Sequence, residues 1–259
     1  MDERSLAASL AGLPIPSIHY FESIGSTNDY ARTLAERAAP DGTLVIADEQ
    51  TQGRGRLNRH WETRSGSALA FSLVIRPAPE EMANLGLFSA LCGLAVCSTL
   101  RSRYGLDAQI KWPNDVLIHR KKTCGILVEA AWLGSQLQGI IAGIGINIAP
   151  SSVPSPGDLL FPATCVESEL GRPVDRENLL AEILQVLTSQ RTSLGSPEFI
   201  ANWESWLAFK GEWVRVEQPE RTLEGKLAGI ARDGSLRLQI KDDEIIEIAV
   251  GDVRLRKAV

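Results

Sequence analysis

The sequence predicts an α+β protein in which a mixed β-sheet domain flanked by helices precedes a small SH3-like β-barrel. Three observations lead to this fold class. Apolar, strand-like runs such as 43–48 and 138–148 are interspersed with helical patterns such as 84–104. Residues 211–257 change to short alternating segments separated by turn residues, which is typical of a small barrel. A chain of 259 residues is long enough for both units. We therefore predict two domains, 1–209 and 210–259.

The chain begins with a short segment, a strand and a capped helix. Residues 1–17 are too few for a folded domain, and we expect them to lie along the surface. Residues 18–23 form an apolar strand pattern, and Ser26 or Thr27 can cap the helix that follows. A helix N-terminus offers free N–H groups and partial positive charge to an anion. Capping alone would explain the same residues equally well.

A basic loop follows the strand predicted at 43–48. Its sequence from 50 to 61 is QTQGRGRLNRHW. Its glycines and arginines are Gly53, Gly55, Arg54, Arg56 and Arg59. Arginine presents a fork of N–H donors that matches phosphate and carboxylate oxygens, and glycine lets the backbone approach a ligand closely. The loop is suited to grip and release an anion, although a solvated basic turn would have the same composition.

The middle of the chain supplies most of the predicted sheet. A buried helix is expected at about 84–104, ended by Gly105, because this stretch is apolar almost all round. The predicted strands are 67–75, 108–112, 115–118, 123–132 and 138–148. In the last strand three glycines share one face, which indicates that a ligand or a helix packs closely against it. Further helices begin at Asp175 and at Ser196.

The sequence KWPND, residues 111–115, is a second polar cluster. Lys111 places a compact positive charge at the end of a strand. Asn114 and Asp115 present oxygens that could hold Mg²⁺ or a ribose hydroxyl. An ordinary Asx turn is the alternative.

Composition excludes several classes of protein. Hydrophobic residues make up 44% and charged residues 23%, which is ordinary for a globular protein. The net charge of −5 argues against a nucleic-acid binder. Four cysteines without a CxxC pair indicate reduced thiols, and the acidic N-terminus with a short, proline-broken apolar run is unlike a signal peptide. The N-terminus therefore predicts a cytoplasmic location, and because no apolar run reaches the ~20 residues that span a bilayer, we expect no membrane association.

Five motifs in a fixed order carry a family resemblance: GSTN, ADEQTQGRGR…RHW, IKWPND, CGILVE and GIGIN. Together they resemble the catalytic core of biotin protein ligases, which is related to class II aminoacyl-tRNA synthetases, and the tail resembles the SH3-like C-terminal domain of these ligases. The likeness runs from about Ile18 to Lys257. It departs mildly at Leu57-Asn58, where a further basic–glycine pair is common, and at Cys124, where alanine or serine is usual.

The resemblance implies a two-step reaction. ATP adenylates the biotin carboxylate with release of pyrophosphate, and biotin then passes to a lysine of a biotin carboxyl carrier domain. Arg54 and Lys111 are implied as catalytic residues that flank the carboxylate and the α-phosphate. The implied biotin contacts are Ser26, Thr27, Asn28, Gln50, Gly53, Arg54, Arg56, Lys111 and Gly125, and the implied nucleotide contacts are Arg56, Arg59, Trp61, Asn114 and Asn147. Mg²⁺ is expected with ATP, its protein ligands being unknown. The basic loop is expected to close as a lid over the hydrolysable adenylate.

Three alternatives compete with this interpretation. A lipoate or octanoate ligase would share the fold and the adenylation chemistry. A repressor would carry a winged helix-turn-helix, but too few residues precede the first predicted strand, so we expect no operator binding. A non-catalytic module that binds the carrier would not need Lys111 and Arg54. A homodimer through the core sheet is a further expectation.

Overall fold

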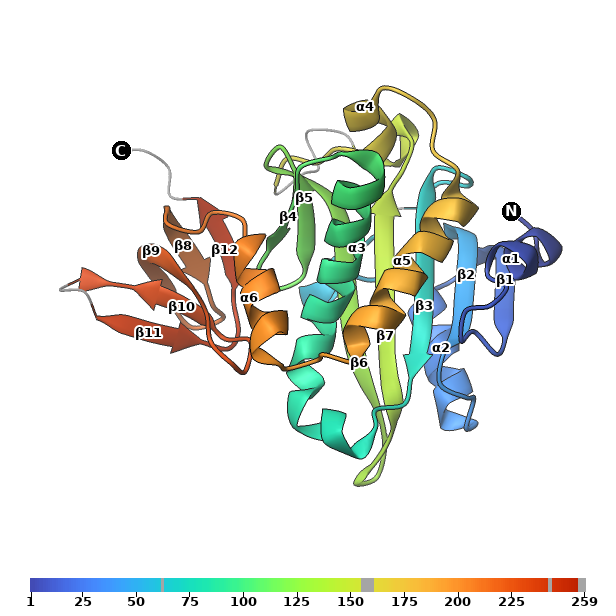
Figure 1. The fold of residues 1–259 in the computed structure, drawn as a ribbon, viewed down its shortest axis with the longest axis horizontal. Coiled ribbons are helices and arrows are strands. Elements are labelled where there is room, and N and C mark those ends of the chain that lie inside the picture. The colour runs from blue at the N-terminus through green and yellow to red at the C-terminus, as the bar shows by residue number, and fades with distance from the viewer. Residues whose placement is uncertain (62, 155–160, 242–243, 256–259) are drawn as a thin grey trace.

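The structure is a computed structural model that describes residues 1–61, 63–154, 161–241 and 244–255 (Figure 1). Its first sheet has seven strands in the order β1-β2-β3-β7-β6-β5-β4, with β1 parallel to β2 and every other neighbouring pair antiparallel. The strands are β1 Ile18–Ile24, β2 Thr43–Gln50, β3 Ala68–Ile75, β4 Ala108–Lys111, β5 Asp115–Ile118, β6 Lys121–Leu133 and β7 Gln136–Asn147. The predicted mixed sheet is confirmed.

Helices cover both faces of this sheet. Helix α2, Thr27–Glu36, packs on β2, β3 and β7 around a small cluster that includes Ala31, Ala35 and Ile141. The larger core lies on the opposite face, where α3, Phe88–Tyr104, and α5, Arg176–Arg191, pack side by side (Figure 1). Strands β3 and β7 are buried along nearly their whole lengths because both faces are covered.

In the structure, the helix predicted at 84–104 is shorter and begins at a later residue. Residues Pro79–Leu87 form a 3₁₀ segment, η2, interrupted at Asn84, and the α-helix α3 starts only at Phe88. Among the described residues, Pro79–Tyr104 is the one helical stretch long and apolar enough to cross a membrane, and 67% of its most apolar window is buried inside the fold. Its hydrophobicity therefore serves the core between the sheet and α5.

The N-terminal segment contains a helix that the sequence pattern did not indicate. Helix α1, Glu3–Ser9, is capped by Asp2, whose side chain accepts a hydrogen bond from the Ser5 N–H. Leu6 is fully buried, and α1 contacts β1 and α5. The expectation of a surface segment is therefore only half right, because Leu6 and Leu10 anchor it in the core. Two further short elements are α4, Val166–Leu170, and η3, Pro150–Ser152.

The C-terminal part forms a second, five-stranded antiparallel sheet in the order β11-β10-β9-β8-β12. Its strands are β8 Trp213–Glu217, β9 Thr222–Ile230, β10 Leu236–Gln239, β11 Ile245–Ile248 and β12 Asp252–Leu255. Helix α6, Pro197–Ser205, lies between the two sheets (Figure 1). The connections next to the two sheets also touch, because the Trp112 indole N–H donates to the Gly234 carbonyl at 3.0 Å. This sheet places Asp252 at its edge, facing the first domain.

Candidate active site

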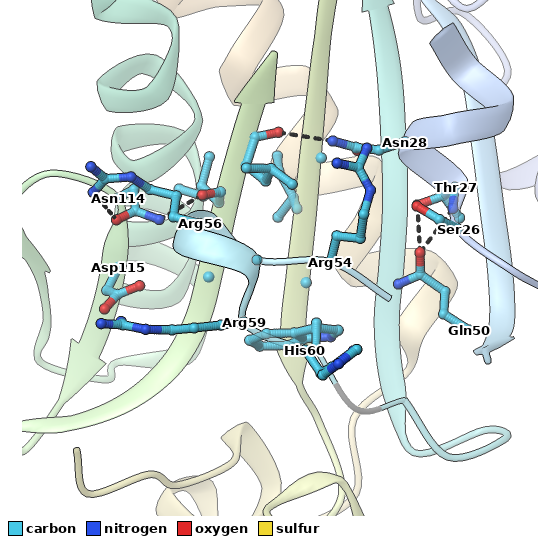
Figure 2. Close-up of a pocket in the computed structure, with 18 of the residues that line it drawn as sticks. Ser26, Thr27, Asn28, Gln50, Arg54, Arg56, Arg59, His60, Asn114 and Asp115 are labelled. Carbon is cyan, nitrogen blue, oxygen red and sulfur yellow. Dashed lines mark hydrogen bonds between the residues drawn. The ribbon is translucent and has the colours of Figure 1, made fainter. Parts of the chain in front are cut away.

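A cavity opens on the face of the large sheet that α2 covers (Figure 2). Its walls come from the N-terminus of α2, the basic loop, β5 and β6, and the floor comes from β7. Ten residues of the predicted site line it: Ser26, Thr27, Asn28, Gln50, Arg54, Arg56, Arg59, Trp61, Asn114 and Gly125. Segments far apart in the sequence thus meet at one place, as the resemblance implied.

The floor consists of glycines placed opposite one another on neighbouring strands. Gly125 of β6 pairs with Gly145 of β7, and Gly143 lies two residues before Gly145 in β7. A Cβ at Gly145 would stand 2.5 Å from the Trp61 ring, and one at Gly143 would stand 2.1 Å from Asn28 Oδ1. Both glycines are therefore needed because a protein side chain packs directly on the strand. Close packing is thus confirmed, and the packed groups themselves line the cavity.

Gly143→Ala is expected to displace the Asn28 amide, because the added methyl group would overlap its oxygen. Overpacking of this kind costs about 2 kcal/mol in the free energy of unfolding. We expect weaker acid binding as well, since Asn28 lines the cavity. Urea denaturation measures the loss of stability, and titration of the protein with the carboxylic acid that it binds measures the loss of affinity. Unchanged values in both would show that Asn28 can move away without cost. Gly86→Ala serves as the control, because Gly86 has no positive φ and an added Cβ would meet its nearest neighbour only at 3.9 Å.

The N-terminus of α2 carries a chain of polar groups. Ser26 is the N-cap, and its hydroxyl accepts from the Asp29 N–H at 3.4 Å. The Thr27 backbone N–H and hydroxyl lie 2.8 and 3.0 Å from Gln50 Oε1 (Figure 2). Ser72 of β3, buried beneath them, donates to Asn28 Oδ1 at 2.6 Å. Capping by Ser26 is therefore confirmed, and Gln50 is oriented with its amide nitrogen free of these contacts.

The basic loop folds as a narrow hairpin. Its arms are joined by the Gly55 N–H donating to the Arg59 carbonyl at 2.7 Å and the Trp61 N–H donating to the Gly53 carbonyl at 2.9 Å. A Cβ at Gly53 would lie 2.4 Å from the Trp61 carbonyl, so only glycine fits there. Leu57 at the tip, in the 3₁₀ turn η1 Arg56–Asn58, has a positive φ of 55°. Gly53 thus shapes the loop but does not line the cavity.

The three loop arginines have different partners. Arg54 forms ion pairs with Glu129 and Asp29. Arg59 forms one with Asp252, at 3.1 Å. Arg56 donates to the neutral Asn114 Oδ1 at 3.1 Å, and no carboxylate of the described residues lies within ion-pairing distance of it. Figure 2 shows Arg54 beside Asn28 and Arg56 beside Asn114, at opposite ends of the cavity.

Electrostatics separates Arg54 from Arg56. Burial lowers the pKa of Arg54, but hydrogen bonds and attraction from Glu129 and Asp29 raise it above its ordinary value. Burial also lowers the pKa of Arg56, and there the attraction of Asp252 and Asp115 does not offset it. The Arg56 guanidinium is therefore a partly desolvated cation that an incoming anion would stabilise.

Lys111 lies outside the cavity lining. Its side chain is 3% exposed, and its ammonium group is bound by Asp252 at 2.7 Å and Asp115 at 3.3 Å. These two carboxylates line the cavity and separate Lys111 from it. The lysine that lines the cavity is Lys122, at 2.7 Å from Asp115 and 5.7 Å from the centre of the Trp61 ring. In this structure Lys122 is therefore the lysine that lines the cavity, and the contact with biotin implied for Lys111 stays a prediction.

Asn147 is also absent from the lining. It is buried, and its amide donates to the Thr164 carbonyl at 3.1 Å, which fixes the end of β7 to a neighbouring segment. Lys122, which lies between the strands predicted at 115–118 and 123–132, and Asp252 were not among the predicted site residues. Strict strand alternation would place Lys122 on the opposite face from Gly125, but the β5–β6 ladder shifts its register between Val116 and Leu117 and brings the Lys122 side chain beside Gly125. Nothing in the sequence indicated that Asp252 reaches the cavity.

The acidic groups of the site do not fit a protein-bound magnesium ion. The Asp115 carboxylate contacts both Lys111 and Lys122, and that of Asp252 contacts Lys111 and Arg59. Asn114 Oδ1 accepts from Arg56. The described part of the chain has no cluster of three or more His, Cys, Asp or Glu side chains suited to a metal. Oxygens engaged by cations are poor Mg²⁺ ligands, so the interpretation of Asn114 and Asp115 as a magnesium site is not supported.

Asp252 should make stability depend on pH. Burial raises the pKa of its carboxyl group, but Lys111 and Arg59 together lower the pKa below its ordinary value. A depressed pKa stabilises the fold above the unfolded-state value of about 3.9, and this stabilisation is lost as pH falls through the folded-state pKa. The difference in unfolding free energy between the wild type and Asp252→Asn should therefore shrink below about pH 4. Urea titrations at several pH values test this, and a constant difference would contradict it.

Comparison with known proteins identifies the family of this chain. A model of the biotin/lipoate A/B protein ligase family matches residues 20–147, and a model of the biotin protein ligase C-terminal domain matches residues 210–256. The biotin–[acetyl-CoA-carboxylase] ligase of Mycobacterium tuberculosis is 30% identical over 98% of this chain and 95% of its own length. The chain belongs to the biotin protein ligase family.

Other members of the biotin protein ligase family agree in sequence and structure. The bifunctional ligase/repressor BirA of Bacillus spizizenii is 34% identical over 91% of this chain and 73% of its own length. The structure of the Aquifex aeolicus biotin protein ligase in complex with biotin and ATP superimposes with a TM-score of 0.79 at 30% identity. It covers 94% of this chain and 100% of that one. The likeness to the Aquifex aeolicus ligase therefore extends over both β-sheets of this chain.

Proposed function

We propose that the protein is an ATP-dependent biotin protein ligase. It adenylates the carboxylate of biotin to biotinyl-5′-AMP, releases pyrophosphate, and transfers biotin to a lysine of a biotin carboxyl carrier domain. The observation that carries the proposal is the partly desolvated Arg56 guanidinium, which lines the cavity without a carboxylate partner among the described residues. Relatives named as biotin ligases, and solved complexes with biotin and ATP, support the same substrates.

The charges of the cavity suggest how the substrates lie in it. At the α2 end, Arg54 and Arg32 are balanced by Asp29 and Glu129. At the other end three cations, Lys111, Lys122 and Arg59, contact only two carboxylates, Asp115 and Asp252, and Arg56 adds a fourth positive charge. The neutral end suits the uncharged ureido ring of biotin, with hydrogen-bonding groups from Thr27, Asn28 and Gln50. The positive end suits the triphosphate.

The residues of this chain have distinct roles in the proposed reaction. Carboxylate and α-phosphate repel each other, so cations must stand where they meet. Arg56 and Lys122 line that region and supply charge to the carboxylate and the phosphate. Trp61 packs on the glycine floor and closes the cavity against water, which protects the acyl-adenylate from hydrolysis. Mg²⁺, if held through the phosphates of ATP, would neutralise further negative charge.

A pyrophosphate-release assay tests the function. The protein with ATP and biotin should release pyrophosphate, and addition of a carrier domain should yield covalent biotin on its lysine. Lipoate and octanoate are the matched acids, and faster adenylation with either would favour the lipoate-ligase alternative. No pyrophosphate with any acid would leave only a carrier-binding module. The domain boundary at 209/210, the cytoplasmic location, the homodimer and the absence of nucleic-acid and membrane binding are retained as parts of the proposal.

A further inference from the structure

Glu129 lies behind the cavity but contacts two residues that line it. It belongs to β6, on the face toward α2, and its side chain is 20% exposed. The Asn28 amide donates to Glu129 Oε2 at 2.8 Å. The Arg54 guanidinium donates to both carboxylate oxygens, at 3.1 and 2.9 Å, in a two-pronged contact. One carboxylate therefore joins the polar group at the α2 end to the first arm of the basic loop.

Every hydrogen-bond partner that the described residues give Glu129 is a donor. Asn28, Arg54 and Arg32 together direct four N–H contacts at its two oxygens. Only an ionised carboxylate can accept all of them, and two-pronged arginine–carboxylate pairs combine strength with a fixed direction. A glutamine would keep one acceptor oxygen and would turn an amide N–H toward the donors. The arrangement of donors therefore requires both the charge and the shape of Glu129.

We propose that Glu129 is a positioning residue that sets the Asn28 amide and the Arg54 arm of the loop in one arrangement. The inference rests on the proposed function, since it concerns how that site binds its acid. Arg54 is then an anchor for the loop and not the cation that meets the phosphate. Asp29, whose carboxylate lies 2.6 Å from Arg54 but is 56% exposed, reinforces the anchor from the solvent side. Water screens that contact, so Asp29 contributes less.

The first test measures hydrogen exchange of the peptide that covers residues 53–61, in the full-length protein without substrates. Glu129→Gln should speed exchange of this peptide at least about tenfold, because the loop loses its anchor. Asp29→Asn, the matched control, removes one charge from the same arginine at its exposed side and should change exchange less than about threefold. Equal exchange in Glu129→Gln and the wild type would overturn the proposal. Urea unfolding of each variant is measured in parallel, and an unchanged midpoint shows that a difference in exchange reports on the loop and not on global stability.

The second test measures KM for biotin and kcat separately. Glu129→Gln should raise KM for biotin about tenfold and leave kcat within about threefold, because a displaced Asn28 and loop weaken acid binding. The double variant Glu129→Gln/Arg54→Met should be no more than about twofold worse than the worse single variant, since both break one contact. Multiplying effects, or a loss confined to kcat, would overturn the proposal. A wild-type protein without pyrophosphate release would sink the proposed function, whereas the exchange result would still decide the role of Glu129.

Discussion

Arg56→Met is expected to lower kcat/KM for ATP in acid adenylation by at least about 100-fold. Removing one preorganised donor from a developing negative charge typically costs about 10²- to 10³-fold in rate. Arg56 is the loop cation without a carboxylate partner among the described residues, so nothing else in the site replaces it. Its burial further strengthens the interaction with an anion, because the surrounding dielectric is low.

The measurement is pyrophosphate release at saturating biotin over a range of ATP concentrations. Arg54→Met is the matched control. It also removes a guanidinium group, two residues earlier in the chain, but this group belongs to a cluster whose positive and negative charges already balance. We expect it to raise KM for biotin and to affect the use of ATP far less. If both variants lost ATP turnover equally, the division of the cavity into a neutral and a positive end would be wrong.

Lys122→Met is expected to slow the reaction, whereas Lys111→Met is expected to destabilise the fold. Lys122 lines the cavity and is partly exposed, so its loss should slow adenylation about 100-fold with little change in stability. Lys111 is buried between two carboxylates, and its loss leaves both short of positive charge inside the protein. Breaking a buried pair on one side costs about 3 kcal/mol in the free energy of unfolding.

Single-turnover adenylation and urea denaturation of the two variants separate these effects. Lys111→Met should unfold at lower urea concentration, and the part that remains folded should still form the adenylate. A Lys111 variant of normal stability that cannot form the adenylate would restore the role predicted from the sequence. A stable Lys122 variant of normal rate would remove Lys122 from the mechanism.

Most elements followed from local patterns because their burial is periodic. The predicted helix from Asp175 carries its buried residues on one face, as the sequence indicated, and Asp175 is its N-cap. Helix α1 was missed because it is seven residues long and buries only Leu6, too little for a periodic signal. The start of α3 was misplaced because a 3₁₀ segment and an α-helix share the same apolar composition.

Residues of the motifs line the cavity where neighbouring elements bring them together, whereas a partner remote in sequence decides which lysine reaches it. Thr27 and Gln50 meet because the parallel pairing of β1 with β2 sets Ile24 opposite Gln50, next to the start of α2. The choice between Lys111 and Lys122 depends on two carboxylates, one of which, Asp252, is 141 residues away from Lys111 in the chain. No local pattern reports such a partner.

The sequence alone determined the family, the order of the strands along the chain, and the residue types that an anion-activating site needs. It did so because hydrophobic alternation, capping and glycine placement act over a few neighbouring positions. Only the tertiary structure decided which cation faces the cavity, because ion pairing depends on distances between segments remote in sequence. In this fold those distances give Arg54 and Lys111 carboxylate partners and leave Arg56 with a neutral one.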